Sequence, residues 1–167
     1  VSSAASDVYK RQEHADGYHT RTASLVKDLD ALDAEYRGGL AHCTNRTIVT
    51  GHEAFAYLAA RYGLTQRGAS GVSPEAEPTP AQLSSISDYV KKNKVTTIYA
   101  ETLVSPKVAQ TIASQTGARV DVLDPIEGLT DASKGSDYLA VMRSNLATLK
   151  KGQGCSCLLY TSHAADA

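Results

Sequence analysis

The spacing of apolar side chains predicts one long helix near the start of the chain. Apolar residues recur at intervals of four, three, four and four positions: Leu25, Leu29, Leu32, Tyr36 and Leu40. This spacing places them on one face of a helix whose other faces carry mostly charged side chains. We therefore predict a helix over about residues 16–40, whose last turn is weakened by two adjacent glycines.

Four short runs, most of them rich in β-branched residues, alternate with amphipathic segments after this helix. The runs cover residues 47–50, 64–69, 95–100 and 119–123, and each is followed by a segment with helical spacing. Strands that alternate with helices of this length are typical of a parallel sheet covered by helices. The predicted fold class is therefore α/β, with a four-stranded parallel sheet, helices on both of its faces, and the long helix in front.

Acidic side chains and one histidine follow the predicted strands. His52 comes directly after the first strand, Glu101 after the third, and Asp124 and Glu127 after the fourth. In parallel sheets, ligands bind outside the carboxyl ends of the strands, so these side chains should share one edge. An imidazole grouped with carboxylates favours a cation over an anion as the ligand.

Charge and motifs exclude several other functions. The net charge is −1, which gives no electrostatic reason to expect nucleic acid or an anionic membrane as a partner. No stretch of about 18 apolar residues occurs, so we expect no membrane span. His52 and Glu53 begin an H-E-x-x-H zinc-protease pattern, but Ala56 stands where the second histidine is needed. A small α/β hydrolase that uses His52 and Glu101 as acid and base remains an alternative.

The two ends of the chain differ from the part between them. Residues 1–12 and 153–167 show no sustained helical or strand period, and they resemble translated sequencing-adapter sequence. We expect such non-native ends to lie outside the fold. Cys155 and Cys157 fall in this tail, so no metal or redox role is predicted for them. Cys43 is then expected to be a small buried apolar residue.

Several segments resemble a known family. IVTGHEAFAYLAARYGL begins at residue 48, an E-P-x-P loop follows, and the match continues through residues 97–129 and 137–152. Together they resemble the C-terminal lobe of zinc-specific substrate-binding proteins of bacterial metal ABC importers, the cluster A-I solute-binding family. On this resemblance, residues 13–42 form the helix that joins two lobes, and residues 43–152 form the C-terminal lobe.

The resemblance also implies a metal site. In the family a metal ion lies between two lobes, and the histidine that matches His52 is a ligand. A histidine here favours Zn²⁺, because manganese-selecting relatives carry a carboxylate at this position. Glu127 is the expected second ligand from this lobe, with Asp124 as the alternative, although Asp124-Pro125 could equally be turn chemistry. Glu101 is expected to orient the ring of His52.

The function implied is that of a binding protein and not of an enzyme. The parent protein would capture Zn²⁺ in the periplasm or at the extracellular face of the cell membrane and deliver it to an ABC permease. The N-terminal lobe, absent from this sequence, would supply the remaining ligands. Contact with the membrane would come only through the permease or a lipid anchor. Manganese-binding, iron-binding and adhesin-type members of the same family are the alternatives.

Overall fold

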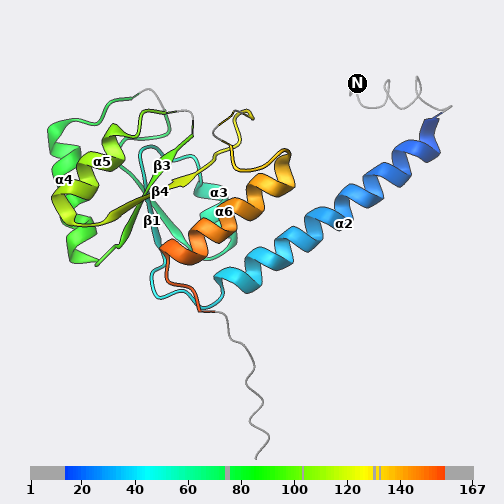
Figure 1. Cartoon of the computed structure of the whole chain (residues 1–167), viewed down its shortest axis with the longest axis horizontal. Helices are drawn as coiled ribbons and strands as arrows, with labels where there is room; N and C mark the ends of the chain where they lie inside the picture. Colours follow the sequence, from blue (N-terminus) through cyan, green and yellow to red (C-terminus); the bar gives the residue numbers. More distant parts are fainter. Residues whose placement is uncertain (1–13, 74–75, 103, 130, 132, 157–167) are drawn as a thin grey trace, which may run out of the picture.

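The chain forms a parallel sheet covered by helices, with one long helix extending away from it (Figure 1). The structure is a computed structural model, and it describes residues 14–73, 76–102, 104–129, 131 and 133–156. The long helix α2 spans Ala15–Leu40, close to its predicted extent. Only its C-terminal half is held in the core, where Leu32, Tyr36 and Leu40 are buried.

The sheet has four strands, all parallel, in the order β2-β1-β3-β4. Their bounds are Thr47–Thr50 for β1, Thr65–Gly68 for β2, Thr97–Glu101 for β3 and Arg119–Leu123 for β4. Strand β3 lies between β1 and β4 and is buried along its whole length, as expected for a strand covered on both faces. The predicted fold class is confirmed.

The remaining helices cover the two faces of the sheet (Figure 1). They are α3 (Ala56–Arg61), α4 (Pro80–Lys92), α5 (Lys107–Thr116) and α6 (Tyr138–Gly152). Helices α4 and α5 enclose a core on one face that includes Val49 and Ile98. Helices α2, α3 and α6 enclose a core on the other face that includes Ile48 and Tyr99. Successive strand residues thus enter opposite cores, as the pleat requires.

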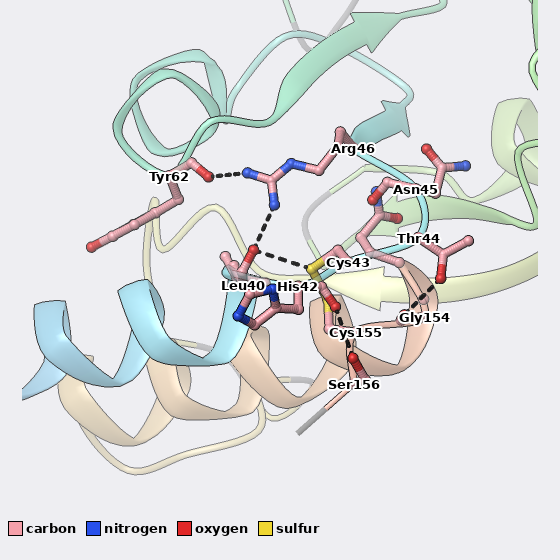
Figure 2. Close-up of a disulfide and its surroundings, with 12 residues drawn as sticks. Leu40, His42, Cys43, Thr44, Asn45, Arg46, Tyr62, Gly154, Cys155 and Ser156 are labelled. Carbon is pink, nitrogen blue, oxygen red and sulfur yellow. Dashed lines mark hydrogen bonds between the residues drawn. A yellow bond between two sulfur atoms is a disulfide. The ribbon is translucent and has the colours of Figure 1, made fainter. Parts of the chain in front are cut away.

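Arg46, between α2 and β1, joins the C-terminal ends of two helices. Its guanidinium donates to the carbonyl oxygen of Leu40 at 2.6 Å and to those of Tyr62 and Gly63 at 2.7 and 2.8 Å (Figure 2). The last carbonyl groups of a helix have no partner within the helix, so a cation there satisfies them. Arg46 therefore fixes the ends of α2 and α3 to the start of the sheet.

The expectation for Cys43 and Cys155 was wrong, because the two form a disulfide (Figure 2). Residues 42–45 and 153–156 lie antiparallel around it. The amide of Asn45 donates to the carbonyl of Gln153 at 3.0 Å, and the amide of Ser156 donates to that of His42 at 2.9 Å. The two cysteines are 112 residues apart in the sequence. Local pattern gave no sign of their pairing.

Gln153 also belongs to the fold, although the sequence placed residues 153–167 outside it. Its side chain is 1% exposed and accepts a hydrogen bond from the hydroxyl of Tyr99 at 2.9 Å. Its amide group donates to the carbonyl oxygens of Asn45 and Thr47. Residues 153–156 therefore pack on the domain, while residues 1–13 and 157–167 lie outside the described part. The adapter-like origin of the two ends stays a prediction.

Candidate metal site

The predicted residues meet at the carboxyl edge of the sheet. His52 follows β1, Glu101 ends β3, and Asp124 follows β4. The three side chains are 3%, 6% and 4% exposed, whereas Glu127 is exposed. Burial of an imidazole beside carboxylates requires that the polar groups have partners.

His52 and Glu101 are paired through two contacts. Ring atom Nδ1 of His52 lies against carboxylate oxygen Oε2 of Glu101, and the backbone amide of His52 donates to Oε1 at 3.2 Å. Because Nδ1 faces the carboxylate, Nε2 is the ring nitrogen left to bind a ligand. A carboxylate that holds one nitrogen of a histidine while the other binds metal is the usual arrangement in zinc proteins.

Burial is the largest influence on Glu101, and it raises the pKa of this carboxyl. The backbone amide and the charge of His52 act in the opposite direction, because both stabilise the carboxylate. The charge of Glu127 raises the pKa of Glu101 further. Glu127 therefore lies within electrostatic reach of the His52–Glu101 pair.

Gln66 in β2 supports the same turn, a role that was not predicted from the sequence. Its amide nitrogen donates to the carbonyl of His52 at 3.1 Å and to the hydroxyl of Thr50 at 2.8 Å. Its side-chain oxygen accepts the amide of Phe55 at 2.9 Å. A glutamine in a half-exposed strand carries no sequence signal for such a role.

Asp124 points into the protein. Its Oδ1 accepts the backbone amide of Ile126 at 2.8 Å, and its Oδ2 accepts the hydroxyl of Ser133 at 2.6 Å. Its main chain is bonded to the side chain of Asn145 in both directions. The carboxylate of Asp124 is thus buried and faces its own loop, whereas Glu127 is exposed. This arrangement favours Glu127 over Asp124 as the second ligand, an assignment that stays a prediction.

The site as described is incomplete for a metal ion. Within the described ranges, no group of three or more histidine, cysteine, aspartate or glutamate side chains is placed to hold one. A small pocket of about 40 Å³ opens beside His52 and Glu101, and its lining includes Val104 and Val108. Zinc sites in proteins take four ligands. This edge therefore presents part of a site.

Comparison with known families decides what kind of protein this is. The chain matches the ZnuA family, described as zinc-uptake complex component A, periplasmic, over residues 4–152. This chain belongs to the ZnuA family. The resemblance inferred from the sequence motifs is confirmed.

Curated relatives carry zinc in their names. The chain is 43% identical over 136 residues to the zinc-binding lipoprotein AdcA of Streptococcus pneumoniae (strain TIGR4), a match that covers 80% of the chain and 27% of AdcA. It is 38% identical over 135 residues to the high-affinity zinc uptake system protein ZnuA of Bacillus subtilis (strain 168), covering 80% of the chain and 42% of that protein. The chain thus spans less than half the length of these relatives.

Solved structures of ZnuA-like proteins share the fold. The laminin-binding protein Lbp of Streptococcus pyogenes superposes with a TM-score of 0.81 at 41% identity, covering 90% of this chain and 58% of that one. The Zn(II)-bound ZnuA-like domain of S. pneumoniae AdcA gives a TM-score of 0.72 at 38% identity, covering 89% and 56%. Among the described residues, no helix is both long and apolar enough to cross a membrane.

Proposed function

We propose that the protein containing this lobe captures Zn²⁺ outside the cytoplasm and delivers it to the permease of an ABC importer. The observation that carries the proposal is the buried His52 ring, whose Nδ1 is held by Glu101 at the carboxyl edge of the sheet. Membership of the ZnuA family supports zinc uptake as the purpose of this pair. The relatives named above are zinc-binding or zinc-uptake proteins.

His52 binds the ion through Nε2, and Glu101 keeps the ring in the orientation and tautomer that make this possible. Glu127 supplies the second ligand from this lobe. A tetrahedral site then needs further ligands. We place them on a second lobe that precedes α2, because the chain covers only 56–58% of the matched structures. Zinc held between two lobes would be released when they part.

Zinc is preferred over manganese or iron because of the donor type. Imidazole nitrogen suits Zn²⁺, whereas Mn²⁺ prefers sites made of oxygen ligands. The buried carboxylate of Glu101 strengthens this preference, since it increases the basicity of the nitrogen opposite. Metal analysis after native purification of the parent protein distinguishes these ions.

The location of the parent protein is proposed to be the periplasm or the outer face of the cell membrane. The family description, a periplasmic zinc-uptake component, supports this location, as does the relative named a zinc-binding lipoprotein. We propose binding without catalysis. Two serines line the pocket with His52: Ser70 donates its hydroxyl to the carbonyl of Gly51 at 3.0 Å, and Ser105 accepts the backbone amide of Lys107 at 3.4 Å. Neither bond pairs a serine hydroxyl with the ring of His52, as a nucleophile and its base would require.

Zinc titration of the chain tests the site. Resonances of His52 and Glu127 are followed by NMR in the ¹⁵N-labelled protein, so that binding elsewhere does not confuse the result. We expect His52→Ala to abolish saturation at this site. His42→Ala is the matched control, since His42 is exposed and lies at the other edge of the sheet. Unchanged zinc binding at Glu127 in His52→Ala would refute the assignment.

The proposed division of the metal site between two lobes leads to a second prediction. The 167-residue chain should bind Zn²⁺ far more weakly than the two-lobed parent, because it lacks part of the ligand set. Calorimetry on both proteins under the same buffer conditions measures the difference. Equal affinities would contradict a site divided between two lobes.

A further inference from the structure

Ile126, in the loop after β4, adopts an unusual backbone conformation. Its φ is +61°, in the left-handed region that β-branched residues rarely occupy. For an L-residue this region is disfavoured by on the order of tenfold in population. Such a conformation persists only where the surrounding structure enforces it, and it is commonest at functional sites. A specific contact must therefore hold Ile126 in place.

Asp124 provides that contact. Its buried carboxylate accepts the amide of Ile126 through Oδ1 at 2.8 Å and the hydroxyl of Ser133 through Oδ2 at 2.6 Å. Asp124 is itself fixed to α6, because its amide donates to Oδ1 of Asn145 at 2.9 Å and its carbonyl accepts from Nδ2 at 2.8 Å. Asn145 is 4% exposed. Asp124 thus attaches the start of the loop to the core.

Glu127 directly follows Ile126. The direction in which the chain leaves Ile126 therefore decides where the carboxylate of Glu127 lies. Leu123, the last residue of β4, is the register partner of Glu101 in β3, so the loop that carries Glu127 leaves the sheet beside the buried His52–Glu101 pair. Glu127 itself is exposed.

We propose that Asp124 is a positioning residue for zinc capture: its buried carboxylate holds the loop at Ile126 and so fixes Glu127 beside His52. The proposal rests on the proposed function in one respect, since it takes Glu127 as a ligand. It gives Asp124 a role different from that of a ligand. Asp124 does not line the pocket beside His52 and Glu101, and its carboxylate is buried against Ile126 and Ser133.

Two substitutions separate the two roles. Asp124→Ala removes both acceptors, whereas Asp124→Asn keeps an oxygen that can accept the amide of Ile126. We expect Asp124→Ala to remove the hydrogen-exchange protection of the Ile126 amide and to weaken zinc binding about tenfold. Asp124→Asn should stay within about twofold of the unmodified chain, because an amide oxygen still accepts. A loss in Asp124→Asn as large as in Glu127→Gln would show that Asp124 is itself a ligand and would overturn the proposal.

A double-mutant cycle tests whether Asp124 acts through Glu127. Zinc binding is measured at the His52 resonance of the full chain for Asp124→Ala, Glu127→Gln and the double variant. If Asp124 only positions Glu127, Asp124→Ala adds no further loss once Glu127 is replaced. Additive losses of zinc-binding free energy would show that Asp124 does not act through Glu127.

Substitution at Ile126 tests whether Asp124 acts through the backbone conformation of Ile126. Glycine adopts a φ of +61° without the steric penalty of isoleucine, although it loses more conformational entropy when fixed, so Ile126→Gly in the Asp124→Ala background should recover part of the lost zinc binding. This double variant also keeps the proposal testable if Asp124→Ala alone does not fold. Absence of recovery would show that Asp124 does not act through the conformation of Ile126.

The failure of this proposal is distinguishable from failure of the proposed function. If Glu127→Gln leaves zinc binding unchanged, Glu127 is not a ligand, and both the ligand assignment and the positioning of a ligand are overturned. If Glu127→Gln weakens binding but Asp124→Ala leaves both zinc binding and the protection of the Ile126 amide unchanged, only the role of Asp124 is overturned.

Discussion

The disulfide between Cys43 and Cys155 should contribute a large part of the stability of this chain. It closes a loop of 112 residues. In the chain-entropy account, a link across a loop of that size lowers the entropy of the unfolded chain by about 16 cal/mol/K, or about 5 kcal/mol at 25 °C. Domains are typically stable by only about 5–15 kcal/mol. Loss of the link should therefore be easy to measure.

The perturbation is the double variant Cys43→Ser with Cys155→Ser. We expect its free energy of unfolding to fall by about 3–5 kcal/mol, with the upper value set by the entropy estimate. For a chain of this length, about 3 °C is lost per kcal/mol, so the melting temperature should fall by roughly 10–15 °C. The hydrogen bonds between residues 42–45 and 153–156 do not depend on the sulfur atoms, so the native fold should persist.

Urea unfolding followed by circular dichroism measures the change in both midpoint and slope. The slope should rise in the double variant, because the unfolded chain without the link exposes more surface. Cys157→Ser is the matched control, since it removes a thiol from the same C-x-C sequence and leaves the Cys43–Cys155 pair intact. Equal stability of the double variant and the unmodified chain would refute the reasoning. So would a loss in Cys157→Ser equal to that in Cys155→Ser.

Two further predictions concern packing and charge. Gly152→Ala should lower the unfolding free energy by about 2 kcal/mol or more in urea titrations, because a Cβ there would collide with the hydroxyl of buried Tyr99. Gly38→Ala, where no atom lies within 4 Å, should instead stabilise by up to about 1 kcal/mol. Hydrogen bonds from side chains including that of Arg61 lower the pKa of Asp33. The contribution of Asp33 to the free energy of unfolding is therefore complete above its unfolded pKa of about 4, and it is lost as the pH falls below that value. The stability difference between the unmodified chain and Asp33→Asn, measured against pH, should accordingly be constant at neutral pH and shrink in acid; a difference that grows in acid would contradict this sign.

Much of the fold could be predicted because its signals are local. The apolar stripe that ends at Leu40 identified α2, and β-branched runs identified the strands. The place of His52 at the carboxyl edge of the sheet could be predicted because that edge follows directly from the positions of the strands in the sequence. The family match confirms the fold class and the class of protein.

The parts that could not be predicted depend on contacts between distant segments. The disulfide between Cys43 and Cys155 joins the two ends of the lobe, and no local sequence pattern indicates this pairing. The inward direction of Asp124 could not be distinguished from an outward one, because Asp-Pro is compatible with a turn and with a ligand. The support that Gln66 gives to His52 depends on the register of β1 and β2. Register between parallel strands is a property of the folded sheet.

The pairing of residues 42–45 with residues 153–156 has a practical consequence for protein engineering. The chain enters and leaves the lobe at one place, beside the amino-terminal start of β1. His52 lies at the other end of that strand. A fluorescent protein or an affinity tag fused after Ser156 would consequently hang from the far end of the lobe. A reporter attached there should leave the carboxyl edge of the sheet, where His52 lies, accessible to the metal ion and to any protein that receives the ion.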